Sequence, residues 1–227
     1  MMRTTISPWE HYGMATTIQQ PATTRESTRA ISHGVRITLR LRPVIDLTSD
    51  HLLELSSLND DLQLEKSAHG ELIITAPAGS DTSDRNAEIT FQLRGWAKRD
   101  GTGISYDSSG GFILPDGAIL APDAAWVVKS RLEALTPAQR EKYLPLCPDF
   151  VIELRSPSDR LPAVQRKMRQ YLANDARLGW LIDPSTQNVE IYRPNSPVER
   201  LDRPDMVSAD PVLSGFTFDF RELWPEP

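Results

Sequence analysis

Two short apolar runs, each carrying a carboxylate, constrain the fold of this chain most. Residues 121–128 read "APDAAWVV", with Asp123 at the mouth of the run, and residues 149–154 read "DFVIEL", with Glu153 inside it. Runs that are apolar on both sides are typical of central strands covered on both faces of a sheet. An ionised carboxylate in such surroundings is costly unless it is paired or binds a cation. We therefore expect Asp123 and Glu153 each to have a partner.

The rest of the sequence alternates between strand and helix patterns. Helices are expected at residues 46–58, with Thr48 or Ser49 as the cap, at residues 84–99, and over about fourteen residues after the "RSPSD" turn. Strands are expected at "LQLEK" and "ELIITAP", which form a hairpin, and at "GISYD", "GGFILP", "LGWLIDP", "NVEIYRP" and "GFTFDF". The segment 129–148 is predicted to be a charged loop or short helix. This order predicts an α/β sandwich.

Length and composition indicate one soluble domain. The chain has 227 residues, and we expect residues 1–44 to form a mobile leader that ends in a candidate first strand, with a single domain at 45–227. No stretch approaches the roughly 18 apolar residues of a membrane-spanning helix. The single cysteine, Cys147, excludes an intramolecular disulfide and a cysteine-based zinc site, and we expect a packed or surface thiol. A cytoplasmic location is predicted.

The charge pattern leaves two interpretations open. The formal net charge of −6 argues weakly against a surface devoted to nucleic acid. Arginine is nevertheless concentrated in residues 25–42, and residues 160–170 carry four basic side chains with no acid. These runs form either a basic face on an acidic protein or solvated arginines on tails and helices.

The two strand carboxylates and a downstream lysine suggest a metal site. If the strands are neighbours, the oxygens of Asp123 and Glu153 converge, and the pKa of one carboxyl rises unless a metal ion lies between them. Ligands that are all oxygen select a hard cation such as Mg²⁺ or Mn²⁺. Lys167, at the margin of the inward face of its helix, is placed to orient or deprotonate a water molecule. This set predicts hydrolysis of a phosphodiester.

Each of these residues also has a structural interpretation. Asp123 ends a turn in that view, and the Pro-Asp pair has little specificity because it recurs at residues 115, 148 and 204. Glu153 then pairs with Arg155, which alternation places on the same face of the strand. Lys167 is a solvated helix residue. Glu88 either reaches the edge of a buried site or is a solvated glutamate favoured by the dipole of its helix.

Two long segments carry a resemblance to a known family. They are "YDSSGGFILPDGAILAPDAAWV" and "PDFVIELRSPSDRLPAVQRKMRQYLANDARLGWLIDP", with "VEIYRP" behind them and "GELIITAP" ahead. From about residue 45 to 195 the chain resembles the Uma-type restriction endonucleases of the PD-(D/E)XK nuclease superfamily. The resemblance implies a restriction-endonuclease-like αβββαβ core with a mixed sheet flanked by helices. The helix and hairpin before it are then an N-terminal extension.

The resemblance also implies roles for individual residues. Asp123 matches the aspartate of the "PD" strand and Glu153 the acid of the next strand, both as metal ligands, and Glu88 looks like an additional acid on the preceding helix. The superfamily lysine two residues after the acid is replaced by Arg155, which cannot act as a base but can hold a phosphate. Lys167 is the displaced substitute for that lysine.

The leading hypothesis is a Mg²⁺-dependent (or Mn²⁺-dependent) endonuclease that acts on DNA, expected as a homodimer because a symmetric pair of sites suits two cuts in a duplex. One alternative is a catalytically inactive nuclease-like module for binding or assembly. Another is a metal-dependent hydrolase of a small phosphorylated compound, although the chain lacks a glycine-rich phosphate loop.

Overall fold

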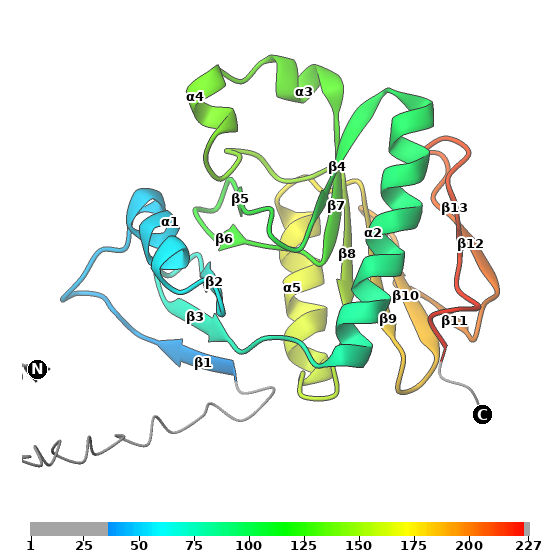
Figure 1. Ribbon diagram of the computed structural model, residues 1–227, viewed down its shortest axis with the longest axis horizontal. Coiled ribbons are helices and arrows are strands. Elements are labelled where there is room, and N and C mark those ends of the chain that lie inside the picture. The colour runs from blue at the N-terminus through cyan, green and yellow to red at the C-terminus, as the bar shows by residue number, and fades with distance from the viewer. Residues whose placement is uncertain (1–35, 225–227) are drawn as a thin grey trace, which may run out of the picture. The chain divides into compact units, whose positions relative to one another are not determined.

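The structure is a computed structural model that describes residues 36–224 (Figure 1). The expected mobile leader falls outside the described residues up to position 35. The helices are α1 (Ser49–Leu58), α2 (Ser80–Asp100), α3 (Lys129–Glu133), α4 (Pro137–Arg140) and α5 (Leu161–Ala173). The strands are β1 (Arg36–Leu39), β2 (Gln63–Lys66), β3 (Leu72–Thr75), β4 (Gly103–Asp107), β5 (Phe112–Ile113), β6 (Ile119–Leu120), β7 (Ala124–Val128), β8 (Phe150–Leu154), β9 (Leu178–Asp183), β10 (Asn188–Tyr192), β11 (Glu199–Asp202), β12 (Met206–Ser208) and β13 (Thr217–Asp219).

A six-stranded mixed sheet forms the centre of the fold, in the order β11-β10-β9-β8-β7-β4. Strand β7 is antiparallel to both β4 and β8, whereas β8 and β9 are parallel. Parallel neighbours need a crossover, and α5 supplies it. Taken in chain order, α2, β4, β7, β8, α5 and β9 make the predicted αβββαβ core, and the predicted α/β class is confirmed.

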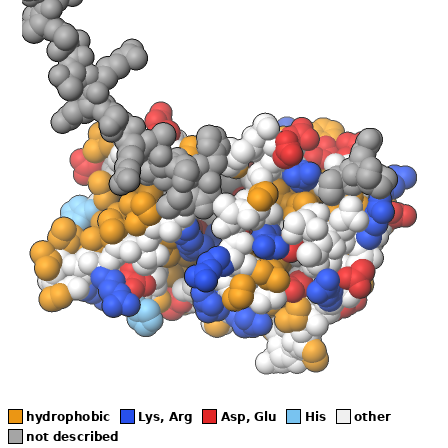
Figure 2. Space-filling view, turned by 90° about the horizontal axis from the view of Figure 1, so that it is seen from below, with side chains coloured by type: hydrophobic (Ala, Val, Ile, Leu, Met, Phe, Trp, Pro, Cys, Tyr) orange, Lys and Arg blue, Asp and Glu red, His pale blue; other side chains and the backbone are white. Residues whose placement is uncertain are grey.

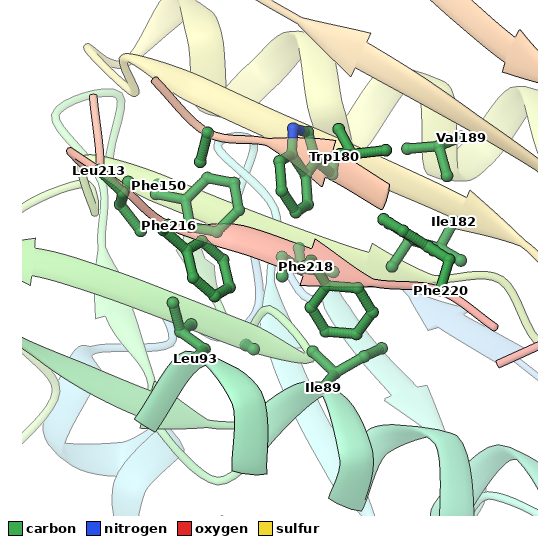
Figure 3. Packing of buried hydrophobic residues seen from close by; sticks show 14 of the residues in the cluster. Ile89, Leu93, Phe150, Trp180, Ile182, Val189, Leu213, Phe216, Phe218 and Phe220 are labelled. Carbon is green, nitrogen blue, oxygen red and sulfur yellow. The ribbon is translucent and has the colours of Figure 1, made fainter. Parts of the chain in front are cut away.

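Helices cover both faces of this sheet. Successive side chains of its strands point to opposite faces, and both sets are apolar, so each face packs against a helix. Phe150 and Ile152 of β8 pack in the same cluster as Ile89 and Leu93 of α2. Figure 3 shows that aromatic residues of the C-terminal segment, including Phe218, complete this cluster. The residues between them point to the opposite face, where the buried side of α5 packs. Glu153 shares that second face, so it is directed toward α5.

A second sheet, in the order β1-β3-β2-β6-β5, lies beside α1. The predicted hairpin of β2 and β3 is confirmed, and Gly70 in its loop has a φ of 82°, which favours glycine. Thr48 caps α1 by accepting a hydrogen bond from the His51 backbone at 3.1 Å, as one of the two expected caps. The prediction did not anticipate that β5 and β6 leave the main sheet. Strand β6 pairs with β2 and β5 pairs with β6, which joins this extension to the αβββαβ core.

Several element boundaries differ from the expected ones. Helix α2 begins at Ser80, four residues before the expected start, and ends at Asp100, one residue after the expected end, with Gly101 as its cap in the left-handed conformation. The segment 129–148 contains two short helices, α3 and α4, where a loop or one helix was expected. The final strand, β13, pairs with β12 in a separate two-stranded sheet. The short elements α3, α4 and β13 carry few residues of periodic pattern, which is why their limits and pairing were missed.

Two further expectations concern burial and the membrane. Cys147 is fully buried with a free thiol, and burial raises its pKa to about 12. A helix with the length and apolar character needed to cross a bilayer does not occur within residues 36–224.

Candidate active site

The register of β7 and β8 brings Asp123 and Glu153 together. Ala124 pairs with Ile152 in this antiparallel ladder, so the residue before Ala124 lies opposite the residue after Ile152. Those residues are Asp123 and Glu153, and both line a cavity of about 410 Å³. The cavity is also lined by the start of α2, by the loop before α5 and by Lys167. The structure therefore gathers three of the residues singled out in the sequence.

Asp123 is held by two neutral donors. Its Oδ2 accepts a hydrogen bond from the backbone N–H of Leu154 at 2.7 Å, and its Oδ1 accepts one from Nδ2 of Asn86 at 3.2 Å. Burial raises the pKa of Asp123, while these donors and the charge of Lys167 oppose the rise. Among the described residues, no ion pair joins Asp123 to a Lys, Arg or His. Its charge therefore remains directed at the cavity.

Glu153 is 6% exposed and has both a neutral and a charged partner. Its Oε1 accepts a hydrogen bond from the hydroxyl of Tyr171 at 3.0 Å and lies 2.7 Å from Nζ of Lys167. Burial raises the pKa of the Glu153 carboxyl, the charge of Lys167 offsets part of the rise, and the charges of Asp123 and Glu65 add to it. A cation beside Glu153 and Asp123 would offset this cost.

Lys167 is almost enclosed by oxygen atoms. Its Nζ lies 2.8 Å from Oε1 of Glu65 and donates a hydrogen bond of 3.0 Å to the carbonyl of Ala121, in addition to its contact with Glu153. Burial alone would lower the pKa of Lys167, but the charges of Glu153 and Glu65 outweigh it and raise the pKa above the usual value. The ammonium form is therefore stabilised, which does not suit a general base.

Glu65 is a site residue that the sequence reasoning missed. It comes from β2, is 2% exposed and lines the same cavity. Its Oε1 also accepts a hydrogen bond from the backbone N–H of Ala121 at 3.0 Å. The signal available in the sequence was an acid within a strand pattern. The alternation of "LQLEK" is, however, equally typical of a strand whose polar side chains face solvent.

Glu88 and Arg155 lie outside this cavity. Glu88 accepts a hydrogen bond from Gln92 at 2.7 Å, one turn along α2, and Asn86 occupies the place on that helix next to Asp123. Arg155 lies 2.7 Å from Oδ2 of Asp183, so it does not pair with Glu153. Arg155 lines a separate cavity of about 210 Å³ that shares Leu154 and other wall residues with the first.

The donor set of the main cavity fits a hard cation. Among the described residues, no three His, Cys, Asp or Glu side chains form a ready-made metal cluster. Asp123 and Glu153 nevertheless present carboxylate oxygens to one cavity, and Mg²⁺ is commonly held by one or two carboxylates together with water and substrate phosphate. The mutual repulsion of these two acids also favours a cation between them.

Comparisons with known proteins identify the family of the chain and a similar fold. No curated protein matches the chain. A crystal structure of a nuclease of the DUF820 family from Anabaena variabilis ATCC 29413, described as putative, is similar in fold, with a TM-score of 0.60 and 23% sequence identity. The similarity covers 71% of this chain and 89% of that chain. The family model Uma2, described as "Putative restriction endonuclease", matches residues 49–221, which is most of the chain. The chain therefore belongs to the Uma2 family.

Proposed function

We propose that this protein is a Mg²⁺-dependent endonuclease that hydrolyses phosphodiester bonds of DNA. Membership of the Uma2 family supports a nuclease function. The observation that carries the finer proposal is the meeting of Asp123, Glu153 and Lys167 in one cavity, at the adjoining ends of β7 and β8. Two carboxylates that can hold a divalent cation, beside an ammonium that balances part of their charge, suit the hydrolysis of a phosphodiester.

In this proposal Asp123 and Glu153 hold Mg²⁺ or Mn²⁺. When bound, such a cation activates water and stabilises negative charge on the phosphate oxygens. The protein groups prepare the two carboxylates: Leu154 and Asn86 fix the orientation of Asp123 through the two bonds described above. Tyr171 fixes Glu153 in the same way. Rigid carboxylates need no reorganisation when the ligand enters.

The phosphate of the substrate would meet Arg36 at the wall of the cavity. The side chain of Arg36 is 32% exposed and its Nη2 lies 3.5 Å from Oε2 of Glu65, so most of its donors remain available to a phosphate. Figure 2 shows Lys and Arg side chains near the middle of the face that includes β1 and the start of α2. This local positive charge would attract DNA despite the net charge of −6.

Arg155 and Glu88 have lesser parts in the proposal. Arg155 would contact a neighbouring phosphate from the adjoining cavity, where its guanidinium is already engaged by Asp183. Glu88 would act only indirectly, since its side chain contacts Gln92 and does not line the main cavity. A homodimer would supply two sites of opposite polarity for a duplex.

Nicking of supercoiled plasmid by purified protein, with Mg²⁺ or Mn²⁺ and with EDTA, tests this function. Glu153→Gln should abolish metal-dependent nicking. Glu190→Gln is the matched control: Glu190 is also a buried strand glutamate that accepts a tyrosine hydroxyl, from Tyr192 at 2.5 Å, and it does not line the cavity. Equal nicking by both variants would contradict the proposal. DNA binding without nicking by the wild type would favour the inactive binding module.

A further inference from the structure

The surroundings of Lys167 resemble those of a bound cation. An ammonium group has three N–H donors, and Lys167 has three oxygen neighbours: Glu65 at 2.8 Å, Glu153 at 2.7 Å and the Ala121 carbonyl at 3.0 Å. Its side chain is only 10% exposed. Every donor is therefore used within the protein, and none is left over for a phosphate oxygen or a water molecule.

The two acids around Lys167 come from different parts of the fold. Glu65 belongs to β2 of the extension, and Glu153 belongs to β8 of the core. Their side chains are 3% and 8% exposed. Two buried carboxylates that share one neighbour repel each other unless a positive charge lies between them. Lys167 supplies that charge, whereas Asp123 on the other side of Glu153 has no ion-pair partner within the described part of the chain.

We propose that Lys167 occupies the second cation position of the site, bridging Glu65 and Glu153, so that the protein takes one divalent metal ion and not two. The single metal ion would then lie on the Asp123 side of Glu153. Glu65 is a positioning residue in this scheme, because it acts by holding the ammonium of Lys167 in place. This inference rests on the proposed function for the metal at Asp123, but the bridge itself does not depend on catalysis.

The test is a count of bound Mn²⁺ per chain by titration calorimetry, with thermal unfolding measured in parallel. We expect one Mn²⁺ in the wild type. Lys167→Gln should bind one Mn²⁺ more than the wild type, because the cation between Glu65 and Glu153 is then gone and Arg36 pairs with Glu65 alone. Its Tm should be lowered in EDTA and recovered by Mn²⁺. Arg166→Gln, which removes an exposed cation from the same helix, should match the wild type in both measurements.

A double variant identifies the acids responsible. In Glu65→Gln/Lys167→Gln the count should return to that of the wild type, since one of the two carboxylates is gone. Two Mn²⁺ in the wild type, or an unchanged count in Lys167→Gln, would overturn the inference. If Lys167→Gln does not fold, the number of Mn²⁺ ions bound by the wild type still tests the inference, because two ions would overturn it. A third outcome is that the wild type binds no Mn²⁺ and Lys167→Gln binds one. This result would contradict the proposed metal ion at Asp123, but it would support the bridge of Lys167 between Glu65 and Glu153.

Discussion

Two Pro-Asp pairs open neighbouring strands of the main sheet and make the same backbone contact. Asp123 precedes β7 and accepts a hydrogen bond from Leu154, at the end of β8, at 2.7 Å. Asp149 precedes β8 and accepts one from Val128, at the end of β7, at 2.9 Å. Because the strands are antiparallel, the two aspartates lie at opposite ends of the pair. Their local sequences and backbone contacts are alike, so any difference in role must come from their surroundings.

The charge around the two aspartates differs. The Oδ1 atom of Asp149 lies 3.3 Å from Nη1 of Arg131, which balances its charge. The Oδ1 atom of Asp123 meets the neutral amide of Asn86, and its acidic neighbour Glu153 is already paired with Lys167. An aspartate that precedes a strand thus has a structural role where a neighbouring cation balances its charge. It becomes a candidate ligand where its charge is left facing a cavity.

The largest expected effect separates the two aspartates by activity. Asp123→Asn keeps a side-chain acceptor but loses the charge, so we expect nicking of plasmid to fall by at least about 10²-fold, as for loss of a group that stabilises transition-state charge. Its Tm should change little. Asp149→Asn should retain nicking because Asp149 does not line the cavity. Both variants are measured for nicking rate and for Tm on the same preparations.

Equal losses of activity in the two asparagine variants would break the comparison. That result would mean that both aspartates act through the stability of the strand pair, and that the charge facing the cavity has no special role.

The next expected effect is a difference in stability between the alanine variants of the two aspartates. Asp149→Ala leaves the Val128 N–H without its acceptor and Arg131 without its partner, which should cost about 2 kcal/mol and lower Tm by about 4–8 °C. Asp123→Ala also removes the acceptor of a backbone N–H, but it relieves repulsion with Glu153, so its loss should be smaller. Chemical denaturation in EDTA measures both. A larger loss in Asp123→Ala would mean that repulsion at the cavity is negligible.

Most of the fold could be predicted because its elements carry local patterns. The core strands are continuous apolar runs, and α2 and α5 repeat apolar residues at helical spacing. The two-residue strands β5 and β6 show no such pattern. Strand β6 joins the second sheet by pairing with β2, which is more than fifty residues earlier in the sequence and therefore leaves no local signal, and β5 pairs in turn with β6.

The site was predictable to the extent that its residues lie on strong patterns. Asp123, Glu153 and Lys167 lie on or beside such elements, so the cavity could be anticipated. The choice between Glu88 and Asn86 could not, because two residues along a helix differ by about 200° in direction. Only the rotation of α2, set by the burial of Ile89 and Leu93, directs Asn86 toward Asp123.

The smallest expected effect concerns the second contact of each aspartate. Asn86 donates to Asp123, but its own Oδ1 is buried and has no hydrogen-bond partner among the described residues. An unsatisfied buried acceptor costs about 1–3 kcal/mol, so Asn86→Leu should leave Tm unchanged or slightly raised. Nicking should fall about tenfold, in line with the loss of a group that orients a metal ligand, because Asp123 loses the donor to its Oδ1.

Arg131→Leu is the counterpart at the other end of the strand pair. It removes the cation that balances Asp149, so Tm should fall while nicking by the folded protein persists, although the partial exposure of Arg131 keeps the loss small. A rise in Tm for Asn86→Leu with a fall in Tm for Arg131→Leu would mean that Asn86 orients Asp123 at some cost in stability. A fall in Tm for Asn86→Leu as large as that for Arg131→Leu would instead make Asn86 a structural residue, and the two ends of the strand pair would then differ only in charge.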